Sequence, residues 1–106
     1  MKTKIVIALF SIVVFAGVAA AQSASAGKTI YASKCSMCHG PDGAANNTMG
    51  KNLKIPDFHS PDVKKMSDTE LKSIILDGKG KMPAYKGKLT EAQVSDVIAY
   101  IHELTK

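Results

Sequence analysis

Arginine and tryptophan are absent from this 106-residue chain, and cysteine occurs only twice. A chain with neither residue, and with no dense basic stripe between aromatics, does not have the composition of a nucleic-acid-binding protein. Two cysteines form a zinc site only if two of the three histidines join them, and the histidines follow no spacing typical of zinc ligands. Alternating apolar and polar residues never run long enough to predict a strand. The sequence therefore predicts an all-α protein.

The N-terminal residues have the order of a secretory signal peptide. A short basic start, Met1–Lys4, precedes the apolar run Ile5–Val18 and then a stretch of small residues. This pattern predicts cleavage after Ala21, with a cut after Ala26 as the alternative, and export to the periplasm or an equivalent compartment. The mature domain is then residues 22–106 without a permanent membrane span. An uncleaved membrane anchor is the competing interpretation.

The segment Cys35–His39 reads CSMCH, a CxxCH motif. Its spacing lets the thiols of Cys35 and Cys38 add to the two vinyl groups of one haem while the His39 imidazole ligates the iron. The motif therefore predicts one covalently attached c-type haem. A redox-active dithiol is the alternative, but it normally lies between a strand and a helix, and no strand is predicted here. Predicted export agrees with haem attachment, because in bacteria this chemistry takes place outside the cytoplasm.

Helical patterns flank this motif and fill the second half of the chain. A short helix is expected over residues 27–34, before the motif. The stretch 40–65 is rich in Gly, Asn, Pro and Asp and is expected to be a long irregular loop that wraps the haem. A capping box of Ser67 and Glu70 starts the next helix, and Gly78 ends it. Its apolar face consists of Leu71, Ile74 and Ile75.

The last predicted helix begins at a second capping box, formed by Thr90 and Gln93. Four apolar residues follow at the i, i+3, i+4, i+7 spacing of an amphipathic helix: Val94, Val97, Ile98 and Ile101.

A six-coordinate iron needs a second axial ligand from the far face of the ring. The favoured residue is Met82, which follows a flexible Gly-Lys-Gly-Lys segment and precedes Pro83, a neighbour that keeps the backbone out of helix. Met49, His59 or a vacant position are the alternatives. Three further side chains are assigned to packing or to the surface: Met37, Met66 and His102.

The order of these features resembles that of small monohaem class I cytochromes c, of the kind represented by cytochromes c6 and c551. The resemblance covers the whole mature chain and depends most on the Cys35–His39 motif and on Gly80–Tyr85, a Met-Pro-Ala-aromatic segment. It implies three to four short helices and long loops around one covalent haem. It also implies that the N-terminal helix crosses the C-terminal helix, with Gly27 and Tyr31 facing Val97 and Tyr100.

Two departures from the family pattern concern the haem pocket. Many members have Gly-Pro, whose proline carbonyl accepts the Nδ1 proton of the proximal imidazole, where this chain has Gly50-Lys51. The Lys51 carbonyl is expected to take this role. The tryptophan that some members place at a haem propionate is missing, and Tyr85 or His59 is expected to substitute.

The predicted function is that of a soluble, monomeric one-electron carrier with His39 and Met82 as axial ligands, and not of an enzyme. The alternatives are a haem subunit of a larger oxidoreductase complex, or an open-site haem protein with ligand-binding or peroxidase-like activity. Four lysines in the segment Lys79–Lys88 predict a docking surface for an acidic redox partner, with a simple solvated face as the alternative.

Overall fold

Residues 22–106, together with residues 8, 11 and 12, are described by the computed structural model; the rest of the predicted signal peptide lies outside the described residues. In this part of the chain all the regular structure is helical, apart from two isolated β-bridges. None of the described helices is long and apolar enough to cross a membrane. The helices are α1 (Ala24–Lys34), α2 (Ser36–His39), α3 (Thr48–Asn52), α4 (Pro61–Lys64), α5 (Asp68–Asp77) and α6 (Glu91–Leu104). The predicted all-α fold is confirmed.

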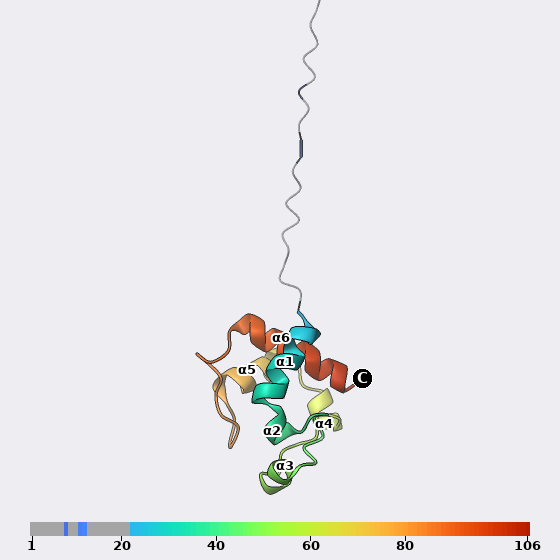
Figure 1. Cartoon of the computed structure of the whole chain (residues 1–106), viewed down its shortest axis with the longest axis vertical. Helices are drawn as coiled ribbons and strands as arrows, with labels where there is room; N and C mark the ends of the chain where they lie inside the picture. Colours follow the sequence, from blue (N-terminus) through green and yellow to red (C-terminus); the bar gives the residue numbers. More distant parts are fainter. Residues whose placement is uncertain (1–7, 9–10, 13–21) are drawn as a thin grey trace, which may run out of the picture.

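Helices α1 and α6 cross at very close range and form the most extensive helix contact (Figure 1). Gly27 lies at the crossing, where an added Cβ would come within 1.9 Å of the Asp96 carbonyl oxygen. Tyr31, one turn further along α1, packs edge-on against Tyr100 with ring centroids 5.3 Å apart. The predicted crossing of these two helices is therefore confirmed.

The start of α1 is held by two hydrogen bonds of Ser23, so that the helix begins three residues before the predicted start at Gly27. The Ser23 hydroxyl accepts from the Ala26 N–H at 3.1 Å, as an N-cap does. The Ser23 N–H donates to Asp96 Oδ1 at 2.8 Å. The first turn of α1 is thus attached to α6.

The apolar core is built around α6. All four predicted residues of its apolar face are buried, and the predicted capping box of Thr90 and Gln93 is present. Tyr31, Ile75 and Leu89 complete the buried cluster.

On α5, Ser67 accepts from the Glu70 N–H, but among the described residues no bond returns from the Glu70 side chain, so only half of that capping box forms.

The stretch 40–65 differs from the predicted irregular loop because it contains α3 and α4. Asn47 caps α3 by accepting from the Gly50 N–H at 2.8 Å, and Pro61 occupies the first position of α4 after Ser60. Helices of four or five residues are too short to show an apolar period in the sequence. The loops around them wrap one side of the cavity described below.

Substituting Gly27 by alanine is expected to lower the free energy of unfolding by about 3 kcal/mol, because α1 must move away from the α6 backbone to admit the methyl group. Chemical denaturation of the haem-loaded protein measures this. Ser25→Ala, at an exposed position in the same helix turn, serves as the control and should change stability by less than about 0.5 kcal/mol. Equal stability of the two variants would contradict the close crossing.

Candidate haem site

A cavity of about 380 Å³ lies between α1, α5, α6 and the loops, within the roughly 300–1,000 Å³ typical of ligand pockets. The three reactive side chains of the CxxCH motif and Met82 all line it. The remaining wall is mainly apolar and includes Leu53, Ile55, Pro56, Phe58, Val63, Met66, Leu71, Ile74, Ile75, Leu89, Val97 and Ile101. The structure therefore brings together the side chains that the sequence predicted to hold one haem.

Tyr31 connects the core to the CxxCH motif. Its ring is 2% exposed, and its hydroxyl donates a 2.6 Å hydrogen bond to the Gly40 carbonyl, directly after His39. The Ala45 N–H donates to the His39 carbonyl at 2.8 Å. Because Tyr31 belongs to α1, the position of the motif depends on how α1 packs against α6.

The His39 imidazole is packed against the ring of Phe58, with centroids 4.7 Å apart and planes inclined by 30°. Gly43, with φ +77°, makes room for this contact, since a Cβ there would lie 2.5 Å from the Phe58 ring. Burial lowers the pKa of His39 below its ordinary value of 6.5. The side chain is therefore held neutral at physiological pH, which is the form that ligates a metal.

Among the residues that the structure describes, none is a hydrogen-bond partner of the buried Nδ1 atom of His39. Lys51, which was predicted to supply the acceptor, lies exposed on α3 and outside the cavity wall; its carbonyl accepts from the N–H groups of Leu53 and Lys54. The predicted role of Lys51 thus stays a prediction, and its carbonyl is already engaged by the end of the helix.

Met82 is carried by a hydrogen-bonded turn, in contrast to the flexible segment that was expected. Lys79 and Met82 exchange two backbone hydrogen bonds, of 3.1 and 3.0 Å. After the turn, the N–H groups of Tyr85 and Lys86 donate to carbonyls at the end of α5. Gly78 permits this packing, because a Cβ there would lie 2.8 Å from the Met82 carbonyl oxygen. Met82 is therefore tied to α5 on both sides.

Of the other predicted or rejected iron ligands, only Met66 shares the cavity with Met82. Met37 and Met49 are 74% and 42% exposed, and Met49 lies outside the wall. His59 also lies outside it and bonds to Asp57 and Leu104. His102 pairs with Asp68 on the surface.

Tyr85 lines the cavity, as predicted for a pocket residue. Its hydroxyl donates to the Lys34 carbonyl at 3.0 Å, which joins the Met82 loop to the end of α1 beside Cys35. Its predicted role at a propionate stays a prediction.

The Cys35 thiol does not have the environment of a reactive CxxC thiol. Burial raises the pKa of Cys35 to about 11, whereas reactive CxxC dithiols have a lowered pKa. Within the described part of the chain, no group of three His, Cys, Asp or Glu side chains is arranged to hold a metal ion. The raised pKa of Cys35 weighs against the dithiol alternative.

Comparison with known proteins decides the family. The profile of the family described as cytochrome c oxidase, cbb3-type, subunit III matches residues 22–101. The chain belongs to the cytochrome c family. It is a monohaem class I member, and membership implies a covalent haem c attached through Cys35 and Cys38.

Two relatives are cytochromes c6. That of Synechocystis sp. is 35% identical over 71% of this cytochrome and 60% of its own length. That of Picosynechococcus sp. is 32% identical, with 95% of this cytochrome and 92% of the relative covered. A third relative, the cbb3-type cytochrome c oxidase subunit CcoP of Azospirillum brasilense, is 29% identical over 79% of this cytochrome but only 29% of that subunit. The chain thus spans most of one cytochrome c6 and less than two thirds of the other two relatives.

The residues of this cytochrome suit the haem that its family carries. Two thiols and an imidazole line an apolar cavity together with a thioether, and the buried His39 Nδ1 leaves Nε2 as the nitrogen available to a metal. Sequence reasoning missed Phe58, whose contact with His39 spans 19 positions and has no local pattern.

Four lysines of this cytochrome also line the cavity: Lys34, Lys54, Lys79 and Lys81. Only Lys79 and Lys81 belong to the run that the sequence singled out; Lys86 and Lys88 lie outside the lining. This group of lysines could not be identified from the sequence, because its members come from three separate segments.

Removing the Tyr31 hydroxyl is expected to destabilise this cytochrome by about 1 kcal/mol, since Tyr31→Phe leaves the buried Gly40 carbonyl with only the longer, 3.3 Å bond from the Gly43 N–H. The unfolding free energy of the haem-loaded protein is the measurement. Tyr100→Phe is the matched control, because its hydroxyl bonds to none of the described residues. A loss in Tyr31→Phe no larger than in Tyr100→Phe would contradict a structural role for this bond.

Proposed function

We propose that this cytochrome is a one-electron carrier whose haem iron is held between His39 and Met82. When bound, the haem supplies an iron that alternates between the ferric and ferrous states. The observation that carries the proposal is that Met82 and the CxxCH motif line one cavity. Both ligands belong to segments tied down by hydrogen bonds, which supports coordination that persists in both oxidation states.

The chain contributes an environment that favours the ferrous state. A thioether sulfur is a soft ligand and raises the potential relative to a second imidazole. The apolar wall contributed by α5 and α6 keeps water from the ring and disfavours the more highly charged ferric centre. No acid or base is required for this task, so we assign a carrier and not an enzyme.

We further propose export, with cleavage after Ala21. Ser23 supports this site over a cut after Ala26, because the later cut would remove the N-cap of α1 and its bond to Asp96. The mature domain would then be residues 22–106, acting in the periplasm or an equivalent compartment.

The lysines on the cavity wall support docking to acidic redox partners. Positive charge around the haem cavity attracts an acidic surface and speeds the encounter of the two proteins at low ionic strength. This group replaces the linear run Lys79–Lys88 as the proposed docking surface.

A second candidate function is that of a haem domain in an oxidase complex, which the match to the cbb3 subunit III profile favours. The identities of 35% and 32% to two cytochromes c6, against 29% to a CcoP subunit, support the free carrier. Analytical ultracentrifugation of the protein from its native compartment distinguishes the two: a monomer supports the carrier, and a stable large complex supports the oxidase domain.

Replacing Met82 by alanine is expected to abolish the weak near-infrared band of sulfur-to-ferric-iron charge transfer. The variant should also bind carbon monoxide, and its potential should fall by on the order of 100 mV, within the roughly 0.8 V range set by axial ligands. The visible and near-infrared spectra and a redox titration measure these changes.

The control is Met66→Leu, because Met66 lines the same cavity. This variant should keep the band and a potential close to that of the wild type. The opposite pattern would make Met66 the ligand. Absence of the band from the wild type, with carbon monoxide binding, would favour the open-site alternative.

Charge reversal of the cavity lysines tests the docking surface. The double variant Lys79→Glu/Lys81→Glu should slow oxidation of the reduced protein by ferricyanide, an anionic probe, by about ten-fold at low ionic strength. The effect should disappear at high salt. Lys86→Glu/Lys88→Glu has the same net charge but leaves the cavity lysines intact. An equal effect in this control would argue against a docking surface formed by the cavity lysines.

A further inference from the structure

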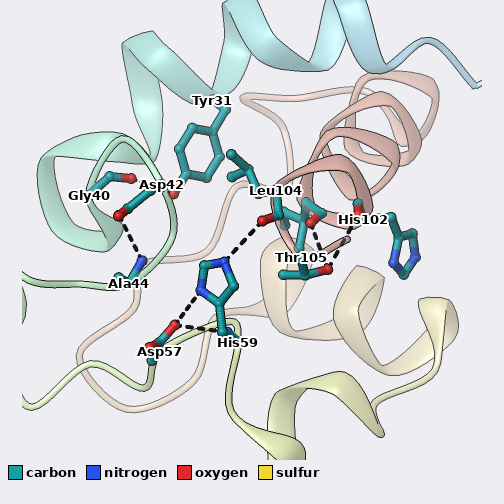
Figure 2. A network of polar contacts seen from close by, with 10 residues as sticks. Tyr31, Gly40, Asp42, Ala44, Asp57, His59, His102, Leu104 and Thr105 are labelled. Atoms are coloured by element: carbon teal, nitrogen blue, oxygen red, sulfur yellow. Dashed lines mark hydrogen bonds and ion pairs between the residues drawn. The ribbon is translucent and has the colours of Figure 1, made fainter.

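The imidazole of His59 bridges two parts of the chain that are far apart in sequence (Figure 2). Nδ1 lies 2.7 Å from Asp57 Oδ1, in its own loop. Nε2 lies 3.0 Å from the carbonyl oxygen of Leu104, the last residue of α6. The loop that contains Phe58 is therefore attached to the C-terminal end of α6 by one side chain.

Both partners of His59 are hydrogen-bond acceptors only. A carboxylate and a backbone carbonyl have no proton to donate, so each ring nitrogen must carry a proton for both bonds to form. A neutral imidazole has a single N–H and can make only one of them. The bridge as it stands thus requires the imidazolium form, which is also favoured at a helix C-terminus.

The bridge is next to the contact that shapes the proximal side of the haem site. Phe58, the neighbour of His59, packs on the His39 ring and fills the space left by Gly43. Its N–H donates to the Gly43 carbonyl at 2.9 Å. On the other side of Phe58, the Asp57–His59–Leu104 bridge anchors the loop.

We propose that His59 is a positioning residue, whose protonated ring clamps the Phe58 loop to α6 and so keeps Phe58 packed on the iron ligand His39. This inference rests on the proposed function, because it treats His39 as the proximal ligand. Deprotonation releases one of the two bonds, loosens Phe58 and lets water approach the proximal side. The reduction potential then falls as pH rises, since water stabilises the ferric state.

The charged groups around His59 agree with a protonated ring. Asp57 from its own loop is the strongest influence, then the Leu104 carbonyl of α6, and Asp42 in the loop after α2 adds to it; together they raise the pKa of His59 above 6.5. The other ionic groups near the end of α6 are engaged elsewhere, in the ion pairs His102–Asp68 and Glu103–Lys106.

The pH window follows from the signs of the two shifts. The pKa of His59 is raised, so its stabilising effect is complete below its ordinary value of 6.5 and is lost as pH rises through the higher native value. The hydrogen bonds from His59 lower the pKa of Asp57, so its contribution is present above 3.8 and is lost as pH falls below that value. The stabilising contributions of both groups are therefore complete between about pH 4 and pH 6.5, and the bridge itself is lost only as pH rises through the higher native pKa of His59.

The test measures the reduction potential of the haem-loaded protein between pH 5 and pH 9. The wild type should show a falling step at the pKa of His59, determined independently by NMR titration of the imidazole in the ferrous state. His59→Gln should lose this step, because glutamine does not titrate. Asp57→Asn should shift the step to lower pH, because the neutral amide no longer stabilises the imidazolium.

Two controls separate positioning from other pH effects. His102→Gln removes the other histidine–aspartate pair of α6 and should leave the step unchanged. Phe58→Leu keeps the charge of His59 but removes the ring on His39, and the step should shrink by at least half. A full step in Phe58→Leu would mean that the charge acts on the iron directly, which overturns the positioning role. A step that persists in His59→Gln overturns the proposal altogether.

Failure of the proposed function has a different signature. It would appear as a wild type without covalent haem or without a reversible one-electron wave at any pH. The bridge is still tested in that case, because NMR reports the His59 pKa without reference to the iron. A native pKa at or below 6.5 would overturn the bridge by itself.

Discussion

The close crossing of α1 over α6 is the contact on which the rest of this small structure depends. Gly27 allows the two backbones to approach, and Tyr31 then extends from the crossing to the carbonyl that follows His39. Tyr31 thereby belongs both to the core and to the haem site. Because the core is thin, no further packing layer compensates for a displacement of α1 at the crossing. Such a displacement therefore also shifts the CxxCH motif. Ser23 reinforces the same contact by joining the first turn of α1 to Asp96.

Away from the crossing, single polar bonds fix the loops. The Met82 turn is closed by two backbone bonds and is joined to α1 through the Tyr85 hydroxyl. The Phe58 loop is held by Gly43 on one side and by His59 on the other. Long loops lose much conformational entropy when they become ordered. A few well-placed donors are therefore needed to keep both sides of the cavity in one geometry, and a carrier benefits because its ligands stay in place when the iron changes charge.

The features that could be predicted from the sequence depend on residues that are close together in the chain. The apolar period of α6 and the capping pair of Thr90 and Gln93 depend on neighbours within a few turns, and both are found as predicted. The CxxCH motif is equally local, and membership of the cytochrome c family supports the haem attachment that it predicts. Gly27 was identified only through the family resemblance. Relations between distant segments were not predicted: Phe58 packs on His39, Lys34 and Lys54 line the same cavity as Lys79, and His59 bonds to Leu104. None has a periodic or spacing signal. The role of Lys51, which was taken from the family resemblance, stays a prediction; its carbonyl accepts hydrogen bonds at the end of α3.

The two sides of the cavity differ in how their geometry responds to pH. On the Met82 side, the turn is held by backbone bonds that do not titrate between pH 4 and pH 9, so its geometry is insensitive to pH. On the His39 side, the imidazole Nδ1 has no hydrogen-bond partner in the described part of the chain, and aromatic packing against Phe58 orients the ring instead. Packing orients the ring without adding a hydrogen bond to it, and burial lowers the pKa of His39 below its ordinary value. It also depends on the contacts that hold Phe58, which are its bond to the Gly43 carbonyl, its edge-on packing against Tyr31 and the protonated bridge of His59. Proton binding at the surface is thereby coupled to the environment of the proximal ligand.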